Sequence, residues 1–199
     1  MCKVYIVCNS YNPNTAPTNR VLSFVRGFSE LGMDAEVVYL APDTKMNKVQ
    51  EDYPHIKFKY MWERMPFSNR ILNKLAEEYY GWKFARSLKC GDVVFLTNFG
   101  NIFFNVIKRK NVKVVHEKTE HPDIYSFKGF NVERYKREIP KLDGMFVIST
   151  ALKDYFSSLG LPKEKIEIVN MTVDSNRFKG IKKQLSEKYI AYCGTASNN

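Results

Sequence analysis

Carboxylate and imidazole side chains are concentrated in one short segment of the chain, from His116 to His121. Glu117 and Glu120 lie between the two histidines, and Pro122 follows directly. Paired Glu and His side chains can orient a hydroxyl group and accept its proton, which is the work of a general base. The same side chains can bind a metal ion, but their spacing is not diagnostic of a metal site. A solvated polar loop without chemistry is the alternative interpretation.

A second candidate site is the polar segment from Asn9 to Arg20. It offers small residues, Thr15 and Ala16 among them, at the expected start of a helix, where backbone N–H groups can receive a phosphate. Arg20, one turn into that helix, can add charge-assisted hydrogen bonds. The segment lacks the Gly-x-Gly-x-x-Gly pattern, so a dinucleotide-binding fingerprint is not supported. An ordinary loop before a helix that begins at Pro17 is the alternative.

Short apolar runs alternate with amphipathic patterns along the chain and predict the elements that position these segments. The expected strands are 4–8, 35–40, 56–60, 92–96, 112–116, 144–148 and 166–169. The expected helices are about 17–32, 66–89, 102–108, 129–140 (with a loop) and 149–159. This order predicts an α/β fold: a Rossmann-like, doubly wound, mainly parallel sheet with helices on both faces.

Ligands of such a sheet bind beyond the carboxyl ends of its strands, which selects four loops here. They are residues 9–18, 97–101, 116–127 and 148–151. Asn98 and Ser149 therefore join Thr15, Ala16, Arg20, His116 and His121 as candidate substrate-binding residues. Ser149 is also suited to capping the helix that follows it.

Composition and charge limit the classes of function. The 199 residues are 44% hydrophobic and carry a formal net charge of +10, which attracts anionic partners. The four cysteines include no Cys-x-x-Cys pair, so a zinc or redox motif is not supported. No signal peptide and no bilayer-spanning run is visible, so we expect a cytoplasmic protein that can lie at the inner face of the membrane.

Basic and aromatic residues are interleaved between positions 57 and 86. Trp62, Arg64, Arg70 and Lys74 belong to this region, which could lie on an anionic membrane. Nucleic-acid binding is a second interpretation of the same pattern. The third is an amphipathic helix whose outer face is simply basic.

Three consecutive segments resemble the end of the N-terminal domain of GT-B glycosyltransferases of the retaining family 4. Residues 148–156 resemble that family's S-x-x-L helix, and residues 160–166 its G-x-P-x-x-K-I turn. Residues 170–178 are similar to its N-G-V-D-x-x-x-F text, with Thr172 in place of the glycine. The segment from Glu117 to Pro122 is similar to an E-x-x-E-x-P loop found in one subset of the family.

The sequence also departs from the family. Thr15 and Ala16 stand where the family has paired glycines. Many members carry a His-Asp pair where this chain has Lys118 and Thr119, so the family's histidine role falls on no single residue here. The family's second domain, with its donor-binding carboxylate motif, is not part of the 199 residues.

The resemblance implies how the chain is organised. Residues 1–174 would form a Rossmann-like acceptor-side domain, 175–187 a linker, and 188–199 the first strand of a truncated nucleotide-sugar-binding domain. Gly194 would lie at the start of that second domain.

The resemblance also implies a function: transfer of a hexose, with retention, from a nucleotide-diphosphate sugar to a hydroxyl of a polysaccharide or glycolipid precursor. Glu117 and Glu120 would act in catalysis, without metal or other cofactor and without nucleic acid as a partner. A lipid-linked acceptor and an anionic membrane surface would be further partners, and the 199 residues alone would be inactive. The alternative from another class is a nucleic-acid or phosphate-ligand binding module of a larger protein.

Overall fold

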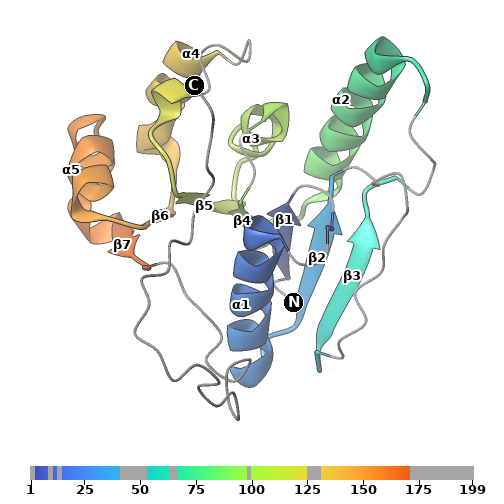
Figure 1. Ribbon diagram of the computed structural model, residues 1–199, viewed down its shortest axis with the longest axis horizontal. Helices are drawn as coiled ribbons and strands as arrows, with labels where there is room; N and C mark the ends of the chain where they lie inside the picture. The colour runs from blue at the N-terminus through green and yellow to red at the C-terminus, as the bar shows by residue number, and fades with distance from the viewer. Residues whose placement is uncertain are drawn as a thin grey trace, which may run out of the picture.

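The computed structural model describes residues 3–8, 11–12, 15–40, 53–62, 67–97, 100–124 and 131–170, apart from the side chain of Arg70. Seven strands form one sheet in the order β3-β2-β1-β4-β5-β6-β7, and all neighbouring strands are parallel (Figure 1). The strands are β1 (Val4–Cys8), β2 (Ala35–Tyr39), β3 (Ile56–Tyr60), β4 (Val93–Leu96), β5 (Lys113–Lys118), β6 (Gly144–Val147) and β7 (Ile166–Ile168). The predicted doubly wound α/β fold is confirmed.

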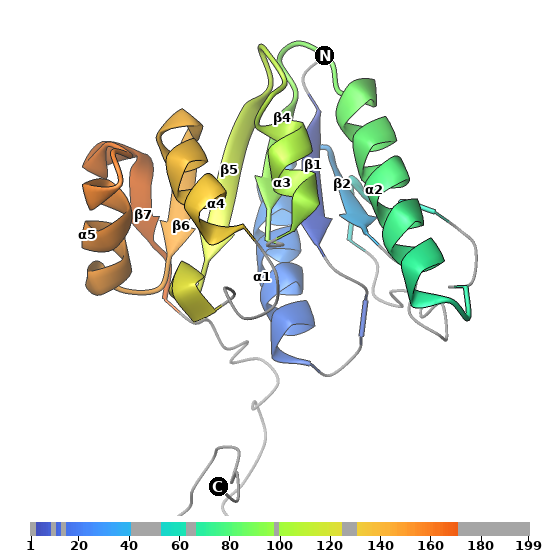
Figure 2. The same cartoon turned by 90° about the horizontal axis from the view of Figure 1, so that it is seen from above.

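Helices cover both faces of the sheet. In Figure 2, α1 lies behind the sheet, and α2, α3 and α4 lie in front of it. The helices are α1 (Ala16–Glu30), α2 (Arg70–Ser87), α3 (Asn101–Val106), α4 (Val132–Glu138) and α5 (Thr150–Ser158), with short 3-10 helices η2 (Ile139–Lys141) and η3 (Lys163–Lys165).

Strand side chains alternate between two apolar cores, as the pleat requires. On β1, Ile6 and Cys8 belong to the core under α1, whereas Val7 belongs to the core under α2, α3, α4 and α5. Phe24 of α1 packs edge-on against Phe95 of β4, with ring centroids 5.0 Å apart. These contacts hold the start of α1 above the middle of the sheet.

The chain leaves the centre of the sheet in two directions. From β1 it passes outward to β2 and β3, then returns to β4 on the other side of β1 and continues outward to β7. The crevice beyond the carboxyl ends of β1 and β4 is the switch point, where sheets of this kind bind their ligands.

Element boundaries differ from the predictions in a few places. Strand β5 continues to Lys118, two residues beyond the predicted end, so Glu117 lies in a strand and not in a loop. Helix α2 begins at Arg70 and not at Pro66, because the side chain of Asn69 accepts a hydrogen bond of 2.8 Å from the N–H of Ile71. The predicted linker and final strand, residues 175–199, lie outside the described residues.

Candidate functional site

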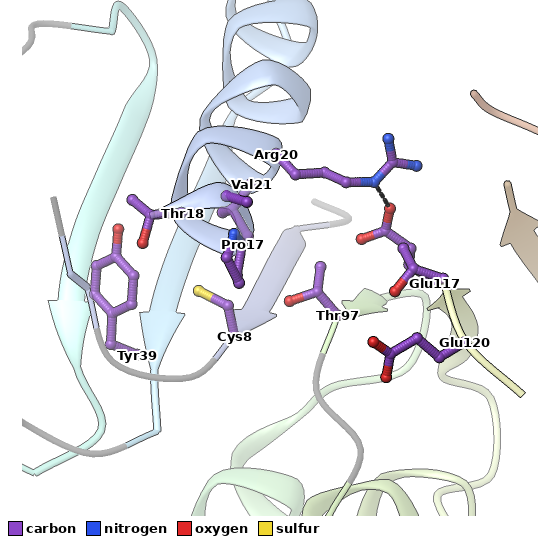
Figure 3. A pocket seen from close by; sticks show the side chains of 11 residues that line it. Cys8, Pro17, Thr18, Arg20, Val21, Tyr39, Thr97, Glu117 and Glu120 are labelled. Carbon is purple, nitrogen blue, oxygen red and sulfur yellow. Dashed lines mark hydrogen bonds and ion pairs between the residues drawn. The ribbon is translucent and has the colours of Figure 1, made fainter. Parts of the chain in front are cut away.

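A pocket of about 270 Å³ lies at the switch point (Figure 3). It is lined by Cys8, Ala16, Pro17, Thr18, Arg20, Val21, Tyr39, Thr97, Glu117, Thr119 and Glu120. The lining comes from the end of β1 and β2, the start of α1, and the chain at and beyond the ends of β4 and β5. Three of the four predicted loops contribute to it; the loop at 148–151 does not.

The first turn of α1 forms one side of the pocket. Ala16, Pro17 and Thr18 line it, so the helix start, where the N–H groups of Ala16 and Thr18 have no acceptor within the helix, lies next to the cavity. Thr15 holds the preceding loop instead of lining the pocket: its Oγ1 donates to the carbonyl of Asn12 at 2.9 Å and lies 3.1 Å from Thr18 Oγ1. The positive end of the helix dipole therefore faces the cavity.

Arg20 and Glu117 form an ion pair at the back of the pocket, pointing toward one another (Figure 3). Arg20 Nε donates to Glu117 Oε1, and both side chains are only 6% exposed. Burial raises the pKa of the Glu117 carboxyl above its ordinary value, although the charges of Arg20 and Lys118 oppose that rise. The guanidinium of Arg20 thus opposes the effect of burial on the Glu117 carboxyl in a site that water barely reaches.

The other donors of Arg20 reach a different part of the chain. Nη1 donates to the carbonyl of Asn170 and Nη2 to that of Val169, both at 2.9 Å. The sequence suggested Arg20 as a phosphate ligand, but these three bonds engage its guanidinium within the protein. Arg20 connects α1, β5 and the chain that follows β7.

Glu120 is the carboxylate of the pocket that solvent reaches. It is an exposed residue two positions beyond the end of β5, and both it and Thr119 line the cavity. Glu117 and Glu120, predicted together, are therefore brought to one pocket with different environments. The buried Glu117 is paired with a cation, whereas Glu120 can meet a ligand that enters from solvent.

His116 points away from this pocket. Alternation along β5 sends it to the opposite face from Glu117, where it is fully buried against the rings of Phe103 and Tyr135. Its Nδ1–H donates to the carbonyl of Leu96 at 3.0 Å, and Nε2 has no hydrogen-bond partner among the described residues. Burial lowers the pKa of His116 to about 3, so the ring is neutral. The candidate ligand His116 is a core residue here.

Lys118 shares the buried environment of His116. It is 3% exposed, although a solvated loop was the alternative interpretation of its segment. Burial lowers the pKa of its ammonium to about 8, while Glu120 and Glu117 act in the opposite direction. The end of β5 therefore places the acidic Glu117 on one face of the sheet and the basic Lys118 on the other.

Two further candidates, His121 and Ser149, do not line the pocket. The ring of His121 lies 4.0 Å from that of Tyr155, and its Nδ1 is 3.5 Å from a carboxylate oxygen of Asp123. Ser149 caps α5, since its hydroxyl accepts a hydrogen bond of 3.3 Å from the N–H of Leu152. Asn98 lies outside the described residues.

The sequence-based selection missed several lining residues, chiefly Cys8, Tyr39 and Thr97. Each stands at or just after the carboxyl end of a strand next to the switch point. Burial raises the pKa of both the Cys8 thiol and the Tyr39 hydroxyl, so both are neutral. A rule that selects the last residue of each strand near the switch point, together with the residue that follows it, would have found all three.

Neither a metal site nor a membrane-spanning helix is found in the part of the chain that the structure describes. No group of three or more His, Cys, Asp or Glu side chains there is arranged to hold a metal ion. No helix within those residues has both the length and the apolar content needed to cross a bilayer.

No protein-family model and no curated protein matches the sequence. The structure, however, is similar to two solved structures, of which one is a galactosyltransferase. The first is the lipopolysaccharide outer core galactosyltransferase WaaB in its apo form, at TM-score 0.57 and 17% identity over 84% of this chain and 45% of that chain. The second is HepE (Alr3699) of Anabaena in complex with UDP and glucose, at TM-score 0.59 and 15% identity over 89% of this chain and 46% of that chain. The chain spans about half the length of both, and it has the Rossmann-like fold of the half that it matches.

Proposed function

We propose that this chain is the acceptor-side domain of a GT-B glycosyltransferase of the retaining family 4. The complete enzyme would transfer a hexose from a nucleotide-diphosphate sugar to a hydroxyl of a polysaccharide or glycolipid acceptor. The observation that supports this most is the position of the pocket: it lies at the switch point of a fold shared with half of the galactosyltransferase WaaB and half of HepE, and Glu120 lines it. HepE, one of those two, was solved with UDP and glucose bound.

In the proposed reaction, the bond between the sugar's anomeric carbon and the diphosphate oxygen breaks. A bond from that carbon to the acceptor oxygen forms, and the acceptor hydroxyl loses its proton. Glu120 would accept a hydrogen bond from that hydroxyl and could receive its proton, because its carboxylate is accessible from the cavity.

The other residues of the pocket would act by position. The first turn of α1 would face the donor diphosphate, since helix N-termini attract anions. The Arg20–Glu117 pair would hold α1 against β5 and so fix the width of the pocket. Most of the donor contacts would come from a second domain, which residues 188–199 would begin, and the family resemblance implies that no metal ion is required.

The test uses the intact protein, incubated with a panel of nucleotide-diphosphate sugars and candidate acceptors. Acceptor-dependent release of nucleotide diphosphate reports the transfer, and the anomeric configuration of the product, measured by NMR, reports retention or inversion. We expect the E120Q variant to fold normally and to lose about 10²-fold or more in rate, the usual worth of a positioned proton acceptor.

Glu133 provides a matched control, because it is an exposed carboxylate on α4 that does not line the pocket. E133Q should keep the wild-type rate. A wild-type rate in E120Q would remove that residue from the catalytic machinery. An intact protein that binds DNA or RNA in a strongly salt-dependent manner, and no nucleotide sugar, would support the binding-module alternative instead.

A further inference from the structure

Helix α2 has two apolar faces. One face packs into the core through Gly81, Phe84 and Ala85, all of them buried. The opposite face is exposed, and we call it the α2 stripe: Ile71, Leu72, Leu75, Tyr79 and Trp82. These five side chains are between 47 and 69% exposed. Their spacing places them along one side of the helix.

Exposed apolar side chains are concentrated on α2 more than elsewhere among the described residues. Nine large hydrophobic side chains are exposed among the described residues; five form the α2 stripe, and Phe67 lies just before the helix. Isolated exposed apolar residues are ordinary, whereas a contiguous group marks a surface that binds a partner or a membrane.

Trp62 does not belong to this surface, although the sequence suggested that it faces a membrane. It is 4% exposed and packs against Tyr80, with ring centroids 5.5 Å apart, and against Phe67. Trp82 is the tryptophan that solvent reaches.

Basic side chains surround the α2 stripe. Lys74, Lys83 and Arg86 are exposed on the same helix, and the guanidinium of Arg86 lies 4.8 Å from the ring centroid of Trp82. Lys57 is exposed on the neighbouring edge strand β3. The same helix carries two acidic residues: Glu77 is exposed, and Glu78 accepts a hydrogen bond from the side chain of Asn101. The surroundings of the stripe are therefore mainly cationic.

We propose that the α2 stripe docks this protein on the surface of an anionic lipid bilayer. An exposed apolar face with Trp, Tyr and Leu, bordered by Lys and Arg, is the composition of a helix that lies in the membrane interface. Aromatic rings occupy the headgroup level, and the basic side chains pair with anionic headgroups. The chain's net charge of +10 adds long-range attraction to such a surface.

The docked orientation follows from the fold. The first turns of α1 and α2 both lie at the edge of the sheet where the strands end (Figure 2). A bilayer in contact with the stripe would therefore reach the same edge of the molecule as the pocket. The docking itself does not depend on sugar transfer, so it can hold or fail independently of the proposed enzyme activity.

The first experiment is co-sedimentation of the 199-residue chain with vesicles of phosphatidylcholine, alone or mixed with phosphatidylglycerol. We expect binding to the mixed vesicles and little to the neutral ones. L75E should lose binding about 10-fold or more, because a carboxylate replaces a buried apolar contact and repels the headgroups. L31E is the matched control, since Leu31 is also an exposed leucine but caps the end of α1, outside the stripe; it should bind as the wild type does.

The second experiment tests how much the basic side chains beside the α2 stripe contribute to vesicle binding. K74E/K83E should weaken binding by about 10-fold or more, at roughly fivefold per charge near the surface. K110E/K113E carries the same net charge and should bind more tightly than K74E/K83E. Lys110, between α3 and β5, and Lys113, the first residue of β5, are both exposed. Binding should also fall between about 0.1 and 1 M salt, where the screening length shortens from about 10 to about 3 Å.

The third experiment follows tryptophan fluorescence during vesicle binding. The emission should shift to the blue and be quenched by brominated lipid, and W82F should abolish both changes while the buried Trp62 still emits. Wild-type binding by L75E, or no binding to anionic vesicles at all, would overturn the proposal. So would a concentration-dependent dimer in sedimentation velocity that L75E disrupts in the absence of vesicle binding, because the stripe would then serve a second copy of this chain.

Discussion

Arg20 on α1 and Glu117 on β5 form a buried ion pair between residues 97 positions apart in the chain. The pair crosses the crevice where the pocket lies, and Arg20 continues to the backbone beyond β7. One guanidinium therefore sets the distances between three separate parts of the candidate site. Its loss would affect both the stability of the domain and the shape of the pocket.

Replacing Arg20 should be strongly destabilising. R20M leaves Glu117 buried without its cation, which typically costs about 3–5 kcal/mol. Urea unfolding monitored by circular dichroism measures the change in the free energy of unfolding. The R20M/E117L double variant should be more stable than R20M, because no uncompensated charge remains buried. A double variant as unstable as the sum of the two single variants would show that the two side chains are not coupled.

The same pair changes the expectation for Glu117. The sequence alone places this residue in a loop, where E117Q would fold normally and affect only the rate. Because Glu117 lies in β5 and is buried against Arg20, E117Q should lower the free energy of unfolding by about 1–3 kcal/mol. E120Q should melt within a few degrees of the wild type, since Glu120 is exposed.

His116 should make the domain sensitive to acid. Its pKa in the folded state is about 3, against an ordinary value of 6.5, so below pH 6.5 the unfolded chain takes up a proton that the folded chain does not. Stability should therefore fall as the pH drops from 6.5 toward 3, with about 3 kcal/mol lost by about pH 4 from this group.

The measurement is the free energy of unfolding at several pH values for the wild type and for H116N, which lacks the titrating ring. The variant's curve should be flatter between pH 6.5 and about 4. Parallel curves would mean that His116 is not the source of the acid sensitivity.

Ser149 should contribute to stability through its cap on α5. S149A should lose about 1 kcal/mol in the free energy of unfolding, and S149G only a few tenths. In the intact enzyme, both variants should keep the wild-type kcat/KM once folded, because Ser149 does not line the pocket. A large fall in kcat/KM with normal stability would restore Ser149 as a substrate-binding residue.

The 199 residues alone should transfer no sugar. In the proposed organisation the donor binds mainly to a second domain, and this chain would supply the acceptor side. Purified chain is incubated with the nucleotide sugars and acceptors that the intact protein uses, and the acceptor is examined by mass spectrometry. Measurable turnover would contradict the two-domain proposal.

The sheet could be predicted from the sequence because its inner strands are mainly apolar: β1 is a continuous apolar run, and β2 is apolar apart from Glu36. Both strands are covered on both faces. Each can therefore be predicted from its own residues, without knowing which strands lie beside it. The edge strand β3 was equally clear, since its alternation of apolar residues and lysines matches its half-exposed pattern.

The candidate site was predicted less completely, for a physical reason. The end of β5 carries His116, Glu117 and Lys118, whose polarity is typical of a loop; their burial depends on partners far along the chain. No local pattern encodes a bond between Arg20 and Glu117, or between Leu96 and His116. Trp62 illustrates the same limit, because only the position of α2 decides which tryptophan is covered.

The bonds of Arg20 also have a consequence for how the protein is made. Its partner Asn170 follows it by 150 residues, so a ribosome adding roughly 5–20 residues per second delivers that carbonyl about 8–30 s after the arginine. Until then the guanidinium lacks the acceptors that compensate for its burial, so its free energy is lower in water than in the crevice. The crevice can therefore be completed only after the nascent chain has passed residue 170.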